Sequence, residues 1–114
     1  MGFRLNKSTK EILITRGDTG RARFTINFDG TPYEMQEGDH IDFGIKANYK
    51  DGTCLIKKSY TENPFVLSIE PGDTKALEFR SYYWDMQFVS ASGFVRTFIA
   101  KKAFTVTEEV VNDG

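Results

Sequence analysis

Apolar and polar residues alternate over several short stretches of this chain of 114 residues. The clearest stretch is residues 82–89, where Tyr82, Trp84, Met86 and Phe88 occupy every second position. A period of two is typical of a strand with one buried and one solvated face. We therefore expect these four side chains to point into the core of a β-structure.

Other stretches of strand-like sequence cover residues 11–15, 21–28, 40–48, 54–60, 64–70, 94–100 and 103–107. Turn-forming pairs separate them, among them Asp29-Gly30 and Asp51-Gly52. We expect Asp51-Gly52 to close a hairpin, because both residue types tolerate positive φ. Lys101-Lys102 predicts a bend or bulge between the last two strands.

Seven or eight short strands, separated by turn signals every 8–12 residues, predict an all-β fold and favour an antiparallel sandwich. The length fits a single domain. We expect an N-terminal arm over residues 1–10, the β-domain over residues 11–111 and a tail over residues 112–114. The only helix expected is one turn near residues 73–78, capped by Asp73.

The aromatic residues predict the composition of the core, because each buries a large area. We expect Trp84 to be largely buried. It should meet the inward side chains of two other strands, namely Phe24, Ile26, Phe43 and Ile45.

The balance of charge argues against two classes of partner. The chain has 15 basic and 16 acidic residues and a net charge of −1, so neither nucleic acid nor an anionic membrane is expected to bind. No apolar stretch approaches the roughly 20 residues of a membrane span. The single cysteine, Cys54, excludes an intrachain disulfide and fits assembly in the cytoplasm.

Residues that could carry chemistry are few. His40 is the only histidine, with Asp39 and Asp42 beside it in sequence. A zinc site needs more His or Cys ligands, and a catalytic Cys54 would need a histidine base with His40 as the only candidate. We therefore expect no enzymatic activity, no metal and no cofactor.

Residues 94–99 break the alternation, because both faces of this strand are apolar. If Val95, Thr97 and Ile99 point inward, three large side chains of the opposite face point away from the core: Phe94, Arg96 and Phe98. Exposed aromatic residues with arginine are enriched at protein interfaces. We expect these three residues to form an interface; the alternative is that a loop or the segment around Phe3 covers the rings.

Several stretches resemble the small immunoglobulin-like β-sandwich domains of phage and prophage tail proteins: Ile14–Asp18, Pro71–Thr74, Tyr82–Phe88, Ser92–Thr97 and Phe104–Val106. Upper baseplate proteins of phages that infect Gram-positive bacteria carry a similar N-terminal domain. The resemblance covers about residues 11–110. Lys101 or Lys102 replaces the glycine that the family usually has before its final strand.

The resemblance implies an immunoglobulin-like sandwich without catalytic residues. It also implies a structural role in a virion assembled in the bacterial cytoplasm. The implied partners are other tail or baseplate proteins, or further copies of the chain. A different class, a carbohydrate-binding module, stays open, because exposed tyrosines can stack on sugars. Its candidates are Tyr33, Tyr49, Tyr60 and Tyr83.

Overall fold

A computed structural model describes residues 2–108, which form an all-β fold with one four-residue helix. The predicted all-β class is confirmed. The strands are β1 (Phe3–Leu5), β2 (Ile12–Thr15), β3 (Gly20–Phe24), β4 (Asn27–Phe28), β5 (Thr31–Pro32), β6 (His40–Lys46), β7 (Ile56–Tyr60), β8 (Phe65–Ile69), β9 (Ser81–Val89) and β10 (Val95–Thr107), and the helix is α1 (Pro71–Thr74). The expected tail, residues 112–114, lies outside the described residues.

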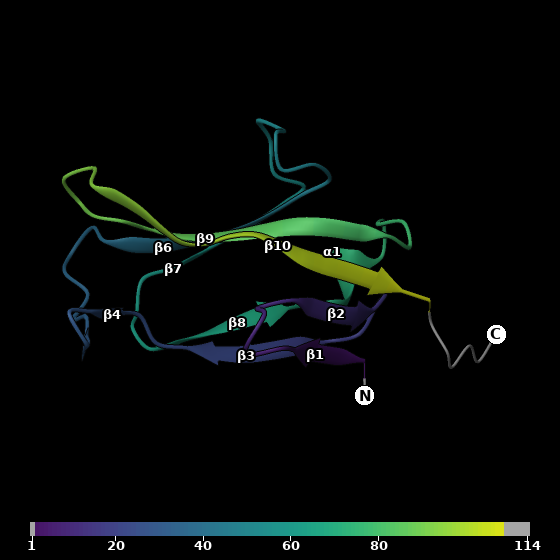
Figure 1. Cartoon of the computed structure of the whole chain (residues 1–114), viewed down its shortest axis with the longest axis horizontal. Coiled ribbons are helices and arrows are strands. Elements are labelled where there is room, and N and C mark those ends of the chain that lie inside the picture. Colours follow the sequence, from purple (N-terminus) through teal and green to yellow (C-terminus); the bar gives the residue numbers. More distant parts are fainter. Residues whose placement is uncertain (1, 109–114) are drawn as a thin grey trace.

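The strands form two layers (Figure 1). The six-stranded sheet has the order β1-β2-β10-β9-β6-β7 and curls, so that β1 and β2 lie in the lower layer of Figure 1 with the antiparallel pair β3–β8. The short β4–β5 hairpin forms a third, two-stranded sheet. β1 belongs to the six-stranded sheet, because Phe3 pairs with Ile14, so part of the expected N-terminal arm is a strand.

The expectation of a purely antiparallel arrangement is wrong at one position. β2 runs parallel to the end of β10, with Phe104 opposite Ile12 and Thr107 opposite Thr15. Parallel neighbours need a long connection, and here almost the whole domain lies between the two strands. Periodicity reports only which face of a strand is buried, so it carries no information on this direction.

The predicted core is confirmed. Trp84, Phe43 and Ile45 are fully buried, and Tyr82, Met86, Phe88 and Ile26 are buried with them. The Trp84 ring contacts Phe43 of its own sheet and Phe24 of the opposite layer, at centroid distances of 5.5 and 6.3 Å. Its indole Nε1–H donates a 2.9 Å hydrogen bond to the Lys10 carbonyl, so its polar group is satisfied.

The start of β9 is fixed by a hydrogen-bonded tyrosine. The Tyr82 hydroxyl accepts from the Glu78 N–H at 2.9 Å and donates to the Glu78 carbonyl at 3.1 Å. The ring itself is buried. Tyr82 therefore joins the core to the backbone of the segment that enters β9.

Residues 21–28 were expected as one strand, but the pairing stops between β3 and β4. At the break, the Asn63 side chain accepts from the Ile26 N–H at 2.9 Å and donates to the Ile26 carbonyl at 3.0 Å. Asn63 also donates to the Tyr33 carbonyl at 2.6 Å. A side-chain amide thus replaces a neighbouring strand as the partner of a buried backbone, and the chain can turn there.

The helix begins two residues earlier than predicted and ends at Thr74. Asp73 does not occupy the cap position; it lies in the first turn and accepts from the Glu70 N–H at 2.7 Å. Pro71 suits the first helical position, because it has no N–H to leave unpaired. The start near residue 73 was therefore wrong, although a single turn of helix is present.

Two turn predictions have different outcomes. Asp29 and Gly30 both have positive φ, 55° and 79°, and close the tight β4–β5 turn. The hairpin expected at Asp51-Gly52 is confirmed, because β6 and β7 pair antiparallel, but the connection is a longer loop in which the Asp51 N–H donates to the Asn48 carbonyl. This loop stands away from the sheet at the top of Figure 1.

The last two predicted strands are one continuous strand, β10, with a bulge where it was expected. Lys101 has a φ of 57°, and the pairing with β9 shifts register between Ile99 and Lys102. The Lys101 N–H donates to the Asp85 carboxylate at 2.8 Å. This bond satisfies the Lys101 N–H, which the bulge leaves without a backbone partner on β9.

Candidate functional site

The most conspicuous surface feature is a group of exposed apolar side chains at the beginning of β10. Eight large apolar or aromatic side chains are exposed among the described residues, and three of them lie within five consecutive positions: Phe94, Val95 and Phe98, exposed to 55%, 53% and 36%. Exposed apolar residues that occur singly are normal, whereas a cluster marks an interaction site.

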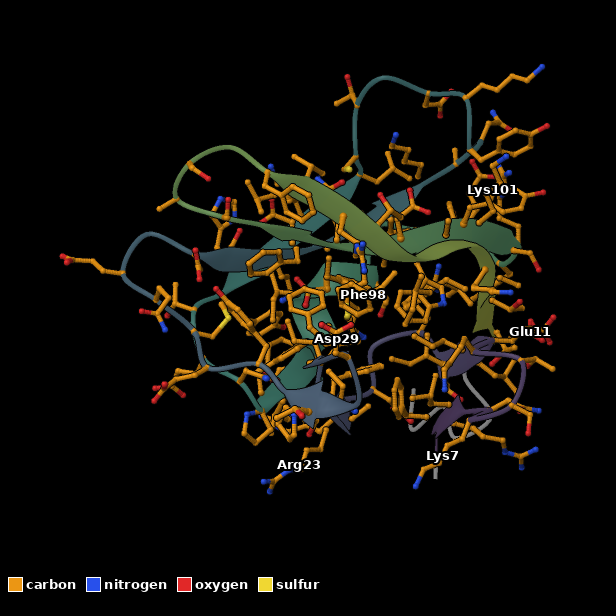
Figure 2. The ribbon with its side chains drawn as sticks, turned by 60° about the vertical axis from the view of Figure 1, so that its left-hand side comes forward. Lys7, Glu11, Arg23, Asp29, Phe98 and Lys101 are labelled. Carbon is orange, nitrogen blue, oxygen red and sulfur yellow. The ribbon has the colours of Figure 1, made fainter. Side chains whose placement is uncertain are left out.

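The β4–β5 turn lies next to this cluster. Phe28, Asp29, Phe94 and Arg96 line a shared hollow of about 210 Å³. We name the six residues Phe28, Asp29, Phe94, Val95, Arg96 and Phe98 the hairpin patch. Figure 2 labels Phe98 on β10 and Asp29 on the turn.

The expected orientation of this strand is wrong in part. Arg96 is opposite Phe88, a buried residue, and Val95 is opposite Val89. Arg96 therefore lies on the face that continues the core, while Val95 lies on the outer face and is exposed. Of the three residues predicted to point inward, Ile99 is buried at 8% exposure, whereas Val95 and Thr97 are exposed. The register shift between Thr97 and Ile99 accounts for the change of parity, because a bulge moves later residues to the other face.

Arg96 closes this end of the core without an ion pair. Its guanidinium lies 5.6 Å from the centroid of the Phe28 ring, which in turn packs edge-on against Phe88 at 5.5 Å. Among the described residues, neither Arg96 nor Asp29 has an ion-pair partner. The hollow thus holds a cation and an anion that are both available to another molecule.

The N-terminal segment does not cover the patch. The Phe3 ring packs instead against Gly20, where an added Cβ would come within 2.2 Å of the ring. β1 lies at the edge of the sheet beyond β2, and β2 reaches β10 only at residues 104–107. The alternative that the segment around Phe3 shields Phe94 and Phe98 is therefore wrong.

The free edge of β10 does not favour addition of another strand. Its pairing with β9 shifts register twice, between Thr97 and Ile99 and again before Lys102. Bulges of this kind twist an edge away from a flat pairing surface and protect it from edge-to-edge association. The hairpin patch therefore offers side chains to a partner more readily than backbone groups.

His40 belongs to a satisfied polar cluster around Asp42. His40 Nδ1 lies 2.9 Å from the Asp42 carboxylate, and the Ser59 hydroxyl donates to the same oxygen at 2.6 Å. Burial raises the pKa of Asp42, but the hydrogen bonds from Ser59 and His40 and the nearby charges outweigh it and hold that pKa below its usual value. Asp42 is 7% exposed, so this cluster stabilises a buried carboxylate.

Asp39, the other neighbour of His40, joins two loops. Its carboxylate accepts from the Tyr33 hydroxyl at 2.6 Å, the Gln36 N–H at 2.9 Å and the Ala91 N–H at 3.0 Å. The Tyr33 hydrogen bond is the largest reason why the pKa of Asp39 lies below its usual value, and it raises the pKa of Tyr33. Asp39 thus ties the segment before β6 to the β9–β10 hairpin.

Cys54 lies over Gly44, on the outer face of the six-stranded sheet. A Cβ added at Gly44 would come within 2.7 Å of the Cys54 sulfur, so the thiol fills space that a side chain would need. The surrounding hollow has a volume of about 160 Å³, and its lining includes Lys46, Lys57 and Asp85. His40 is not among the residues that line it, so the structure does not bring Cys54 and His40 together in one pocket.

Two further observations concern residues 2–108 only. They contain no group of three or more His, Cys, Asp or Glu side chains that could hold a metal ion. No helix within them has the length and apolar character needed to cross a membrane.

The four tyrosines proposed for sugar binding fall into two pairs. Tyr33 and Tyr60 serve the fold: the Tyr33 hydroxyl binds Asp39, and the Tyr60 hydroxyl accepts from the Ser68 N–H at 3.1 Å. Tyr49 and Tyr83 lie edge-on to each other at 5.6 Å, and Tyr49 is 46% exposed. Only this second pair offers an aromatic surface for a ligand.

Comparisons with family models, with curated proteins and with solved structures give no match to this chain. The function proposed below therefore depends on the geometry of the hairpin patch and on the resemblance of the sequence to domains of phage tail proteins.

The sequence analysis named three members of the patch as an interface, Phe94, Arg96 and Phe98. It expected Val95 to point inward and did not name Phe28 or Asp29. The alternation of residues 21–28 predicts only that Phe28 points inward. The Asp29-Gly30 turn accounts for Asp29 without any role in binding. Their proximity to Arg96 depends on the way that the β4–β5 hairpin folds back, and no local pattern reports a contact between positions so far apart in the chain.

Proposed function

We propose that this chain is a non-enzymatic assembly module of a phage or prophage tail or baseplate, acting through protein–protein contacts made by the hairpin patch. We further propose that its fold is an immunoglobulin-like β-sandwich. The partners are other tail or baseplate proteins, and the site of action is a virion assembled in the bacterial cytoplasm.

The order of the strands supports the immunoglobulin-like fold. In the variable type of that fold, strands G, F, C and C′ are neighbours in one sheet, while B and E are neighbours in the other. The sequence β10-β9-β6-β7 and the pair β3–β8 correspond to these two arrangements in the same chain order.

Tyr82 supports it further. Immunoglobulin-like domains often carry a tyrosine near the start of strand F whose hydroxyl bonds to the backbone a few residues upstream, two residues before a cysteine. Tyr82 bonds to the backbone of Glu78, and Trp84 stands two residues later. The contact between Trp84 and Phe24 then joins the two layers, in a chain whose single cysteine cannot form the usual disulfide.

One observation carries the proposed role: the clustering of Phe94, Val95 and Phe98 in exposed positions beside Arg96, which has no ion-pair partner among the described residues. Burial of large apolar side chains contributes roughly 1.5–3 kcal/mol each, so selection for stability alone favours covering them. Aromatic residues and arginine are also the residue types that carry most binding energy at interfaces.

The proposal is tested on particles. Tails or virions purified from a bacterium that encodes the chain should contain it, as detected by mass spectrometry. A Phe94→Ser/Phe98→Ser variant encoded in the same genome should be depleted from the particles, whereas a Leu55→Ser/Val66→Ser variant, which removes exposed apolar residues elsewhere, should be retained. Absence of the wild-type chain from intact particles contradicts the proposed role.

Sugar binding is the second candidate, and the pairing of Tyr49 with Tyr83 is the observation that favours it. Tyr83 is opposite Lys46, which lines the hollow over Gly44 together with Asp85, so aromatic and polar groups are close together. A glycan array decides between the two functions. Binding that is lost in Tyr49→Ala and retained in Phe94→Ser would favour the carbohydrate-binding module.

A further inference from the structure

We propose that the hairpin patch binds a second copy of this chain about a two-fold axis, with Arg96 of each copy facing Asp29 of the other. This inference rests on the proposed function and specifies one partner for the same surface.

The charges of the patch argue for a second copy. Arg96 and Asp29 line one hollow, and neither has an ion-pair partner among the described residues. A partner of a single charge would satisfy one of them and repel the other. A two-fold related copy presents both signs, so that two equivalent ion pairs form across the axis.

The exposed ring of Phe94 is placed to be buried by the same contact. Phe94 is 55% exposed and shares the hollow with Arg96 and Asp29, whereas Val95 is exposed on the opposite face of the strand. Two-fold contact brings the two Phe94 rings and the two Arg96 side chains into one interface. Aromatic side chains and arginine guanidinium groups attract each other when they are removed from water.

The contact should be weak. Six residues are fewer than the roughly 20–30 residues a side of a standard interface, so association should depend strongly on concentration. A weak contact of this kind is useful in a particle in which neighbouring copies are already held close together, because the effective concentration is then high.

A charge-reversal mixture tests the inference. Asp29→Arg leaves two cations in the patch and Arg96→Asp leaves two anions, so each variant alone should dimerise about tenfold or more weakly than the wild type. In an equimolar mixture the two variants should form a heterodimer, because every intermolecular pair is again of opposite charge. Native mass spectrometry separates this heterodimer from either homodimer.

Arg23→Asp is the matched control, since it reverses an exposed arginine on β3 away from the patch. It should dimerise like the wild type. Circular dichroism spectra establish that each variant is folded, and this matters for Asp29→Arg because Asp29 has positive φ.

A wild type that is monomeric at every concentration overturns the inference. So do charge-reversal variants that dimerise like the wild type, or a mixture of folded variants without heterodimer. If any of these results is obtained while Phe94→Ser/Phe98→Ser is still depleted from particles, the proposed function stands and the partner is a different protein.

Discussion

The hydroxyl of Tyr82 holds both backbone groups of Glu78, accepting from its N–H at 2.9 Å and donating to its carbonyl at 3.1 Å. Because the Tyr82 ring is buried at 3% exposure, this pair of bonds fixes where β9 leaves the preceding segment. This position of β9 places the alternate side chains that follow, including Trp84, in the core.

Tyr82→Phe should remove these two bonds and leave the ring in place. Glu78 is exposed and water can reach it, so we expect a loss of about 1–2 kcal/mol in the free energy of unfolding. Urea denaturation of the variant beside the wild type measures this. An unchanged stability would mean that the hydroxyl is not needed to hold the start of β9.

Trp84→Ala should be far more costly, by about 3–5 kcal/mol, because it opens a large cavity between the two layers. The variant also loses the bond from the indole to the Lys10 carbonyl. Tyr83→Ala, one residue away on the opposite face, is the control and should cost much less. A loss below about 1 kcal/mol for Trp84→Ala would contradict the central position of this ring.

Asn63→Ala should destabilise the chain by about 1–3 kcal/mol, because it leaves the buried Ile26 N–H without its partner and removes the bonds to the Ile26 and Tyr33 carbonyls. The Ile26 carbonyl keeps one bond, from the Tyr33 N–H. Asn63→Asp keeps the acceptor for the Ile26 N–H but loses the donor and places a carboxylate near two carbonyls. It should therefore not restore wild-type stability. Chemical denaturation compares the three proteins, and full rescue by Asp would contradict the role of the amide.

The stability of the chain should fall in acid. The pKa values of Asp39 and Asp42 are both lowered in the folded state, so the charged form is favoured there relative to the unfolded chain. This contribution is fully present above the unfolded pKa of about 4 and is lost as the pH falls through the lower folded pKa values.

Asp39→Asn should accordingly weaken the dependence of unfolding free energy on pH below about 5. Glu62→Gln, at an exposed position between β7 and β8, should leave that dependence unchanged. The measurement is urea denaturation at a series of pH values. Identical pH profiles for Asp39→Asn and the wild type would show that the bonds to Tyr33, Gln36 and Ala91 do not favour the charged carboxylate.

The sequence predicts those features of the fold that depend on neighbouring residues. The alternation in residues 82–89 predicted the buried face of β9 with Trp84 at its centre, and this is confirmed. The Lys101-Lys102 pair predicted the bulge in β10. Each of these depends on the conformation of a few consecutive residues.

Features that depend on distant residues were not predictable in the same way. The break at Ile26 is caused by Asn63, and the burial of Asp39 depends partly on Ala91, 52 residues later. The parallel pairing of β2 with β10 joins the two ends of the domain. In the hairpin patch, exposure of Phe94 and Phe98 followed from a strand with two apolar faces, but the position of Arg96 did not, because a bulge reversed the parity.

Sedimentation velocity over a range of concentrations tests most directly whether the hairpin patch holds two copies together. We predict a concentration-dependent dimer for the wild type and for Leu55→Ser/Val66→Ser, which alters residues exposed to 53% and 44% outside the patch. Phe94→Ser/Phe98→Ser should remain folded and monomeric. The opposite result, three folded proteins that sediment identically at every concentration, would contradict this role of the patch.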